Sequence, residues 1–199
     1  PMIVRVYEAV QAALPALDIT IATDDIKIQT VLNDREIPSI LTCIDHETGS
    51  DRAAEVARIC SWDESDIVIN VQGDEPLIEP TLIGAVAAEL QARPDCVMST
   101  AAHSIDAMAD FLNPNVVKVV LDRNRSALYF SRAPIAWWRD GMATGALPSP
   151  APLRHIGLYA YRAGFLRHFP ALQASPLEFT ESLEQLRVLW HGERIAVHI

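Results

Sequence analysis

Cysteine is scarce in this chain, and its pattern argues against two classes of small stabilised protein. The three cysteines, Cys43, Cys60 and Cys96, are odd in number and lack the close spacing of a metal site. Neither a disulfide framework nor a zinc-binding module is therefore indicated. Three unpaired thiols are typical of a reducing compartment, so we expect a cytoplasmic location.

Long apolar runs and export signals are also missing. No segment is long enough to cross a bilayer as a helix, and the opening residues Pro1-Met2-Ile3-Val4-Arg5 do not have the form of a secretory signal. We therefore expect a protein that has no membrane partner and is not exported. The Ser-His-Asp and Cys-His arrangements that mark nucleophilic enzymes are not found either.

Basic side chains are outnumbered by acidic ones. The chain has 16 lysines and arginines against 26 aspartates and glutamates, which gives a formal net charge of -10. Nucleic acid and anionic membrane surfaces, which bind through bulk positive charge, are therefore not expected partners. A small anionic substrate is still compatible, because local arginines, backbone amides or a metal ion can hold it.

The composition supports one folded domain over residues 1–199. Half of the residues (50%) are hydrophobic, enough to bury a sizeable core. In the first half of the chain, helical and strand patterns alternate, which indicates parallel β-α-β units. Helices are expected at residues 2–14, 25–33 and 50–60 and from Pro80 onward, and strands at residues 18–22, 39–44, 67–71 and 96–101.

The pattern changes after residue 113. Residues 116–121 and 127–131 have the character of short strands joined by a hairpin loop at residues 122–125. This predicts a small antiparallel insertion on the sheet. Residues 137–152 contain several glycines and prolines without periodicity, which predicts a long surface loop.

A clear helix start lies near the C-terminal end of the sequence. Ser175 can cap the helix, Pro176 suits its first position, and Glu178 completes a capping box. We expect this helix to continue to about His191 and to end at Gly192. Glu181, Glu184 and Gln185 would then share one face of it, and for Glu181 we favour a solvated position.

The most informative segment is an apolar strand that ends in a glycine and two acids, Ile67-Val68-Ile69-Asn70-Val71-Gln72-Gly73-Asp74-Glu75-Pro76. Gly73 permits a sharp exit and Pro76 stops the ladder, so Asp74 is left at the carboxyl end of an expected buried parallel strand. Open α/β sheets bind ligands at this edge, where a carboxylate can hold a divalent cation and through it a nucleotide phosphate. A polar turn that merely caps a core strand would give the same pattern.

Three motifs together resemble the 3-deoxy-manno-octulosonate cytidylyltransferases, also called CMP-Kdo synthetases. They are Val71-Gln72-Gly73-Asp74-Glu75-Pro76, Tyr129-Phe130-Ser131-Arg132-Ala133 and Glu184-Gln185-Leu186-Arg187-Val188-Leu189-Trp190. The resemblance runs along the whole chain. It implies an α/β, Rossmann-like (GT-A-like) nucleotidyltransferase fold, in which helices flank a mostly parallel sheet.

The same resemblance implies a reaction and its participants. CMP would be transferred from CTP to 3-deoxy-D-manno-octulosonate (Kdo), giving CMP-Kdo and pyrophosphate for lipopolysaccharide biosynthesis. Mg²⁺ would neutralise the phosphates. We also expect a homodimer.

The resemblance assigns roles residue by residue. The implied nucleotide-binding residues are Arg52, within the turn Thr48-Gly49-Ser50-Asp51-Arg52, together with Gln72 and Asp74, and Asp74 is also the implied Mg²⁺ ligand. The implied Kdo-binding residues are Arg132, His155, Tyr159, Glu184 and Gln185, with Arg132 near the sugar carboxylate. Catalytic roles are implied for Asp74 and Arg132. Taken alone, His155 would be read as a structural histidine.

The sequence departs from the family pattern at both ends. The family begins with a strand and a glycine- and basic-rich phosphate loop, and it continues to a further aspartate that joins the metal site; neither segment is present here. We therefore expect residues 1–199 to lack the N-terminal phosphate-loop strand and the C-terminal segment, and so to leave a sheet edge unpaired. We also expect these residues alone to bind CTP poorly and to turn over little.

Two other functions are compatible with these observations. A CMP-sialic acid synthetase would share the sheet and the nucleotide chemistry, although Arg132, His155, Tyr159 and the Glu184-Gln185 pair favour Kdo. The chain could instead be a catalytically incompetent α/β module that acts only by oligomerising. Trp137 and Trp138 beside the long loop would suit such a contact, and local packing would explain them equally well.

Overall fold

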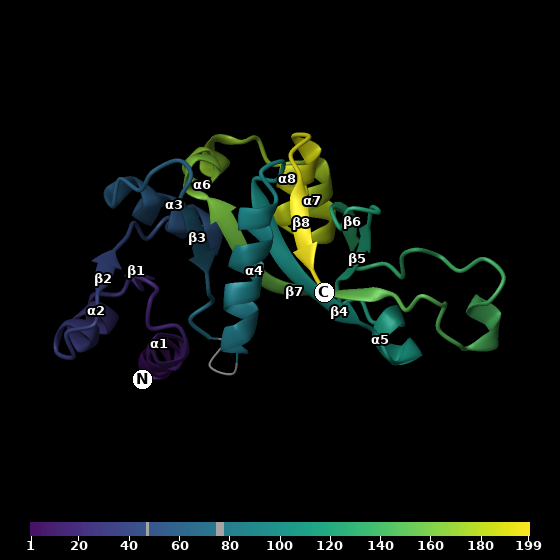
Figure 1. Ribbon diagram of the computed structural model, residues 1–199, viewed down its shortest axis with the longest axis horizontal. Coiled ribbons are helices and arrows are strands. Elements are labelled where there is room, and N and C mark those ends of the chain that lie inside the picture. The colour runs from purple at the N-terminus through teal and green to yellow at the C-terminus, as the bar shows by residue number, and fades with distance from the viewer. Residues whose placement is uncertain (47, 75–77) are drawn as a thin grey trace.

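The computed structural model describes residues 1–46, 48–74 and 78–199 (Figure 1). Helices and strands alternate through the first half of the chain, as the sequence predicts. The helices are α1 (Met2–Ala13), α2 (Ile26–Asn33), α3 (Gly49–Ile59), α4 (Pro80–Ala92), α5 (Met108–Leu112), η1 (Met142–Thr144), α6 (Ala163–His168), η2 (Phe169–Ala171), α7 (Pro176–Glu181) and α8 (Gln185–Trp190). The strands are β1 (Ile21–Thr23), β2 (Ser39–Leu41), β3 (Ile67–Asn70), β4 (Met98–Ser104), β5 (Lys118–Leu121), β6 (Ala127–Ser131), β7 (Leu153–Arg162) and β8 (Ile195–His198).

The strands form two separate sheets. β1 and β2 pair in parallel, and with α1 and α2 they lie at the left of Figure 1. The other six strands form a sheet in the order β6-β5-β7-β4-β8, with β3 also paired to β7. The α/β class with flanking helices is as expected, and the larger sheet is mixed because β7 runs antiparallel to β3, β4 and β5, while β4 and β8 are parallel.

The strand β7 is the organising element of the larger sheet, and its role was not foreseen. It is ten residues long and pairs with three different strands along its length. Its burial pattern changes from partly exposed at Leu153 to buried at residues 158–161. Because its neighbours change along its length, no single alternation of polar and apolar residues marks it as a strand.

Two sequence expectations about pairing and helix length are wrong. Residues 67–71 were expected to form a buried parallel strand, but the strand observed there, β3, is half-buried and pairs antiparallel with β7. The helix that starts at Ser175 was expected to continue to His191, but it stops at Glu181, where Ser182 takes a left-handed conformation (φ 53°) and separates α7 from α8. Glu181 therefore does not share a helix face with Glu184 and Gln185.

Local signals explain the helix starts that the sequence predicted correctly. The Asp25 side chain accepts a hydrogen bond from the Lys27 amide at the start of α2, and the Thr48 hydroxyl accepts one from the Asp51 amide at the start of α3. Ser175 forms the full capping box with Glu178. The predicted hairpin is also present as β5 and β6, which pair in antiparallel register with Val119 opposite Phe130.

The core lies on both faces of the larger sheet. One cluster packs side chains of α3, α6 and α8, such as Ala57, Leu166 and Leu186, against the sheet. A second cluster packs α1 and α4, through Val10 and Val86 among others, on the opposite face. Helices on both faces are what an α/β sheet requires to bury its two apolar surfaces.

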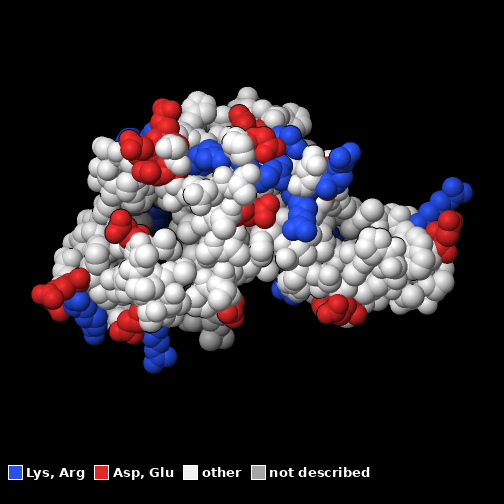
Figure 2. Space-filling model, viewed as in Figure 1, with Lys and Arg blue, Asp and Glu red and all other residues white. Residues whose placement is uncertain are grey.

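The surface features agree with the composition. On the face shown in Figure 2, basic and acidic side chains lie among one another. Arg194 pairs with both Asp95 and Asp122, at 3.2 and 3.3 Å. The three cysteines are free, with Cys96 buried. Within the described ranges, no helix has the length and apolar character needed to cross a bilayer.

Candidate active site

The start of α3 packs directly against the carboxyl end of β3. A Cβ atom added at Gly49 would lie 2.9 Å from Gln72 Nε2 and 3.2 Å from Asn70 Nδ2. Both atoms are the ends of flexible side chains, so a larger residue at position 49 would have to displace the Gln72 amide and shift the Asn70 amide slightly. The turn at residues 48–52 and Gln72 therefore lie together, and their nucleotide-binding roles stay predictions.

Arg52 links the first turns of α3 to the ends of β1 and β2. Its guanidinium pairs with Asp24 at 2.7 Å and donates hydrogen bonds to the Thr42 hydroxyl and, at 3.4 Å, to the Cys43 carbonyl. The hydrogen bond from Arg52 lowers the pKa of Asp24. The guanidinium is thus held at the edge of the site, with its donors shared among protein groups.

Asp74 lies exposed, four residues beyond the end of β3. Its neighbours Glu75 and Pro76, which completed the predicted motif, are outside the described residues. Among the residues that are described, no group of three or more His, Cys, Asp or Glu side chains could hold a metal ion. An exposed carboxylate still fits Mg²⁺, which commonly binds through one or two protein carboxylates together with substrate phosphates and water.

A buried relay of hydroxyl groups connects α3 to Glu184. Ser50 is fully buried, and its Oγ atom donates to Glu184 Oε1 at 2.9 Å. Ser50 Oγ is also 2.8 Å from the hydroxyl of buried Tyr161. Since a serine hydroxyl has one proton to donate, Tyr161 donates to Ser50 and Ser50 donates to Glu184. This relay joins the turn at residues 48–52, predicted to bind nucleotide, to Glu184, predicted to bind Kdo.

Three buried polar atoms in this region have no hydrogen-bond partner among the described residues. They are Asn70 Nδ2, Glu184 Oε2 and Gln185 Nε2. A buried polar atom left unpaired costs about 1–3 kcal/mol, so such atoms are uncommon in folded proteins unless a ligand completes them. They provide two amide donors and one carboxyl acceptor for a polar ligand.

His155 and Tyr159 lie on β7 in a row of aromatic rings. The His155 ring is 4.8 Å from the Phe130 ring and 5.6 Å from the Tyr159 ring, measured between centroids. His155 Nε2 lies 2.9 Å from the Thr100 hydroxyl. Tyr159 is the register partner of Asn70 on β3, which places it beside one of the unpartnered amides.

Arg132 is held by backbone carbonyls in the break between α7 and α8. Its guanidinium donates to the carbonyls of Glu181, Pro114 and Ser182, at 2.6, 3.1 and 3.4 Å. Its carbonyl accepts a hydrogen bond from the ammonium of fully buried Lys118. Arg132 therefore positions the segment that leads to Glu184, and its contact with a substrate carboxylate stays a prediction.

The expectation that Glu181 is solvated is wrong. Its carboxylate accepts hydrogen bonds from the Ser131 hydroxyl at 2.7 Å and from the Arg132 amide at 2.9 Å. These bonds tie the end of β6 to the end of α7. The residue is thus a structural link close to the site.

Sequence reasoning missed Ser50, Tyr161 and Asn70. Asn70 had a usable signal, because it is the one polar residue within the apolar run 67–71. Ser50 and Tyr161 are 111 residues apart, and nothing in either local sequence indicates that their hydroxyls meet.

Comparison with known proteins shows which protein family this chain resembles. A family model described as "Cytidylyltransferase" matches residues 1–195. A 3-deoxy-manno-octulosonate cytidylyltransferase from Leptothrix cholodnii is 60% identical over 100% of this chain and 74% of the relative's length. One from Methylibium petroleiphilum is 57% identical over 100% of this chain and 77% of its own length.

The chain belongs to the cytidylyltransferase family.

A solved cytidylyltransferase structure agrees in fold. It is described as CMP:2-keto-3-deoxy-manno-octonic acid synthetase complexed with CTP, and it has a TM-score of 0.88 with 37% sequence identity. The match covers 100% of this chain and 78% of that one. The relatives thus contain sequence beyond the part that this chain matches.

Burial shifts the pKa values of the enclosed titratable groups in this cytidylyltransferase. Desolvation lowers the pKa of His155 to about 3, so its ring is neutral near pH 7. Burial raises the pKa of Glu184, and the hydrogen bond from Ser50 opposes this rise. Burial likewise raises the pKa of Tyr159 and Tyr161, and the nearby Glu184 carboxyl adds to both shifts. The enclosed region is therefore rich in neutral hydrogen-bonding groups.

Proposed function

We propose that this chain transfers CMP from CTP to Kdo, giving CMP-Kdo and pyrophosphate. The observation that carries this proposal is the 60% identity to a named 3-deoxy-manno-octulosonate cytidylyltransferase over the whole of the chain. The three unpartnered polar atoms of Asn70, Glu184 and Gln185 support it, because a polyhydroxylated sugar acid offers both acceptors and donors to complete them. A CMP-sialic acid synthetase is disfavoured, since the named relatives act on Kdo.

The nucleotide half of the proposed site lies at the start of α3 and the end of β3. Backbone amides at the first turn of an eleven-residue helix favour an anion, and Gln72 adds an amide side chain beside them. Arg52 keeps this turn fixed to the ends of β1 and β2. CTP binding thus uses local donors in a chain whose overall charge is negative.

The sugar half of the proposed site is formed by β7 and the start of α8, and Asn70 at the end of β3 lies between the two halves. Glu184 Oε2 accepts from a sugar hydroxyl, while Gln185 Nε2 and Asn70 Nδ2 donate to oxygen atoms of the sugar acid. His155 is neutral and Tyr159 stays protonated, so both can hydrogen-bond without adding charge. Arg132 offers its guanidinium near the Glu181–Ser182 segment that precedes these residues.

The reaction forms one phosphorus–oxygen bond and breaks another. The anomeric hydroxyl of Kdo attacks the α-phosphorus of CTP, loses its proton, and displaces pyrophosphate. Positioning and charge stabilisation account for most of the acceleration in such transfers, so no protein nucleophile is required. Asp74 would hold a magnesium ion, which would neutralise the phosphate charge.

The proposal extends to the location, the biosynthetic role and the oligomeric state of the enzyme. Three free cysteines support a reducing, cytoplasmic location, and a CMP-Kdo product supports a role in lipopolysaccharide biosynthesis. A homodimer is supported by Trp137, which is 63% exposed on the loop that extends away from the sheet at the right of Figure 1. Light scattering of the purified protein tests the dimer.

A chimera tests the function with this chain's own site residues. Residues 1–199 replace the matching part of the full-length Leptothrix relative, and pyrophosphate release is measured with CTP and Mg²⁺ in the presence of Kdo or N-acetylneuraminate. We expect turnover with Kdo and little with N-acetylneuraminate. The unmodified relative serves as the positive control.

Two outcomes would contradict the proposal. One is a folded chimera that is inactive with Kdo while the relative is active under the same conditions. The other is a preference for N-acetylneuraminate. A Glu184→Gln variant of the chimera should raise the KM for Kdo more than the KM for CTP, because the change lies in the sugar half of the site.

A further inference from the structure

An irregularity in the pairing of β4 with β7 lies beside His155. The register shifts between Ser99 and Ala101 of β4, so Thr100 faces more than one residue of β7. Such a bulge interrupts the regular hydrogen bonds of the ladder and redirects nearby side chains. Thr100 is fully buried, so its hydroxyl has to form its hydrogen bonds within the protein.

The Thr100 hydroxyl has three polar neighbours but only one proton. Its Oγ1 atom lies 2.9 Å from the Ile156 carbonyl oxygen, 2.8 Å from the Leu158 carbonyl oxygen and 2.9 Å from His155 Nε2. A carbonyl oxygen can only accept, so a hydroxyl that donated to the histidine would leave two carbonyl oxygens close to its own oxygen without a proton between them. The hydroxyl proton therefore goes to the β7 carbonyls.

This assignment determines which nitrogen of His155 carries the ring proton. Nε2 lies beside an oxygen whose own proton is committed elsewhere, so Nε2–H donates and Thr100 Oγ1 accepts. Desolvation lowers the pKa of His155 to about 3, so the ring holds a single proton near neutral pH. Nδ1 is therefore left with a lone pair. The partner of one ring nitrogen commonly sets the state of the other in this way.

The lone pair of Nδ1 is open to a ligand. Within residues 1–46, 48–74 and 78–199, Nδ1 makes no hydrogen bond, and it is not one of the three buried polar atoms that have no partner. The Phe130 ring packs edge-on against the His155 ring, at an interplanar angle of 68°. The imidazole is thus held by Phe130 and Thr100, while its second nitrogen can still accept a hydrogen bond.

We propose that Thr100 is a positioning residue for sugar binding, which holds His155 in the Nε2–H tautomer so that Nδ1 accepts a hydrogen bond from a hydroxyl group of Kdo. This inference rests on the proposed function, because it concerns the sugar half of the same site. Thr100 does not touch the sugar. It acts only through the orientation and the tautomer of the imidazole.

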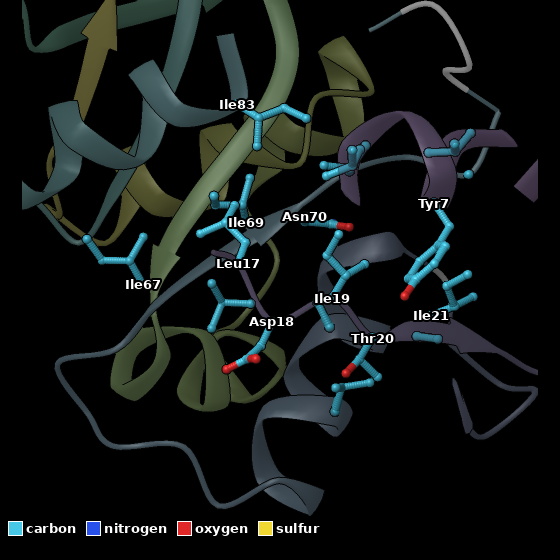
Figure 3. A pocket seen from close by; sticks show the side chains of 18 of the residues that line it. Tyr7, Leu17, Asp18, Ile19, Thr20, Ile21, Ile67, Ile69, Asn70 and Ile83 are labelled. Atoms are coloured by element: carbon cyan, nitrogen blue, oxygen red, sulfur yellow. The ribbon is translucent and has the colours of Figure 1, made fainter. Parts of the chain in front are cut away.

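The tautomer also orients the sugar. Asn70 Nδ2 and Gln185 Nε2 are unpartnered donors among the described residues, and Asn70 also lines the cavity of about 530 Å³ in Figure 3. His155 Nδ1 is an acceptor. A neutral lone pair attracts a hydroxyl proton and repels the oxygen atoms of a carboxylate. The sugar therefore presents a hydroxyl group to His155 and directs its carboxylate toward donors.

Nitrogen NMR measures the tautomer without sugar or turnover. The chimera described above is labelled with ¹⁵N-histidine, and the His155 signals are identified by their loss in a His155→Gln variant. We expect the Nε2–H tautomer near pH 7 in the chimera and in its Thr100→Ser variant, which keeps the hydroxyl. Thr100→Val keeps the branched shape but offers Nε2–H no acceptor, so this variant should populate the Nδ1–H tautomer.

Kinetics with the same variants test the effect on sugar binding. Thr100→Val should raise the KM for Kdo about tenfold, as expected for the loss of one hydrogen bond to the ligand, and should change the KM for CTP less. Thr100→Ser should keep the KM for Kdo close to that of the unsubstituted chimera. A threonine that only stabilised the fold would not separate the two KM values.

Ser99 provides a matched control on the same strand. It is also fully buried, and its hydroxyl donates to the Val86 carbonyl of α4 at 2.7 Å, on the opposite face of the sheet. Ser99→Ala therefore removes a buried bond from a hydroxyl to a carbonyl without changing the surroundings of His155. This variant should lower the Tm, and it should leave the tautomer and the KM for Kdo unchanged.

A ligand titration tests the contact even if the valine variant does not fold. The labelled chimera is saturated with Kdo in the presence of a CTP analogue whose α- and β-phosphorus atoms are joined by a methylene group, which prevents transfer. We expect the Nδ1 signal of His155 to shift as this atom accepts a hydrogen bond. The Nε2 signal, whose partner is Thr100 in both states, should shift less.

Three results would overturn the proposal. The first is an Nδ1–H tautomer in the unsubstituted chimera. The second is a folded Thr100→Val variant with the same KM for Kdo as Thr100→Ser. The third is an Nδ1 signal that stays in place when Kdo saturates the site.

Failure of the proposed function gives a different observation. A folded chimera that is inactive with Kdo contradicts that function and, with it, the sugar contact of His155. The assignment of the Nε2–H tautomer to Thr100 is still decided by the NMR spectra of the chimera and its Thr100 variants, because these spectra require no sugar.

Discussion

At the scale of single residues, Ser50 connects two parts of the molecule that are far apart in sequence. Its hydroxyl accepts from Tyr161 on β7 and donates to Glu184 before α8. All three groups are enclosed, and the second Glu184 oxygen has no partner among the described residues. The orientation of that free oxygen therefore depends on one serine hydroxyl.

The Ser50→Ala substitution should destabilise the protein and weaken sugar binding. Removing the hydroxyl leaves Glu184 Oε1 and the Tyr161 hydroxyl unpaired in a buried region, which costs about 1–3 kcal/mol. Urea denaturation measures this loss, and the KM for Kdo in the chimera should rise while the KM for CTP changes less. Ser65→Ala, at an exposed serine, is the matched control and should leave both quantities unchanged. Equal stability of the Ser50→Ala and Ser65→Ala variants would show that the relay does not stabilise the fold.

His155 should make stability depend on pH. Its pKa is about 3 in the folded protein because of desolvation, and about 6.5 in an unfolded chain. Between these values the unfolded chain binds a proton that the folded protein excludes, so the free energy of unfolding falls as the pH falls from about 6.5 toward 3. Glu184 acts in the opposite sense, because its raised pKa favours the protonated folded form at low pH.

A His155→Gln variant isolates the histidine contribution. Glutamine cannot take up the proton, so the stability difference between the two proteins should shrink as the pH is lowered from about 7 to about 4. Urea denaturation at several pH values measures this difference. A difference that stays constant across the range would show that His155 does not titrate in this way.

At the scale of elements, the break between α7 and α8 positions Glu184 and Gln185, the residues predicted to bind Kdo. Ser182 takes a left-handed conformation, and the carbonyls of Glu181 and Ser182 then accept hydrogen bonds from Arg132. A continuous helix would use these carbonyls internally. The break could not be read from the sequence, because neither glycine nor proline marks it, whereas the capping box at Ser175 is a local signal and was predicted correctly.

The effect of a substitution at Ser182 on stability should depend on how well the new residue tolerates the left-handed conformation. Ser182→Gly should change stability by less than about 0.5 kcal/mol, since relief of strain offsets the flexibility of glycine in the unfolded chain. Ser182→Val should destabilise by about 1–3 kcal/mol, because a β-branched residue is strained at positive φ. Thr180, which is exposed within α7, provides the control. There Thr180→Gly should destabilise the protein more than Thr180→Val, because glycine is unfavourable within a helix. Thermal unfolding of the four variants checks both orders.

At the scale of the whole molecule, the sequence predicts the alternating helices and strands, the hairpin and the family. The longest strand, β7, was missed because its pairing partners change along its length. The site residues were assigned through motifs, which are local, and their roles stay predictions. The contacts that join the two halves of the site, such as Ser50 with Glu184, arise from packing between segments 134 residues apart and leave no local trace.

The division of the strands into two sheets has a consequence for activity. The anchors of Arg52 belong to the small sheet, while Asn70 and Glu184 belong to the larger one or to elements packed on it. Among the described residues no strand pairing joins the two sheets. Weak CTP binding by residues 1–199 alone stays a prediction.

Phosphorus NMR of the reaction mixture tests the central claim most directly. The chimera that carries residues 1–199 is incubated with CTP, Kdo and Mg²⁺, and the phosphorus signals are followed with time. The account predicts that CTP is replaced by pyrophosphate and one phosphodiester, CMP-Kdo, in equal amounts. Unchanged CTP with a folded chimera, or the appearance of CDP and inorganic phosphate instead, would contradict it.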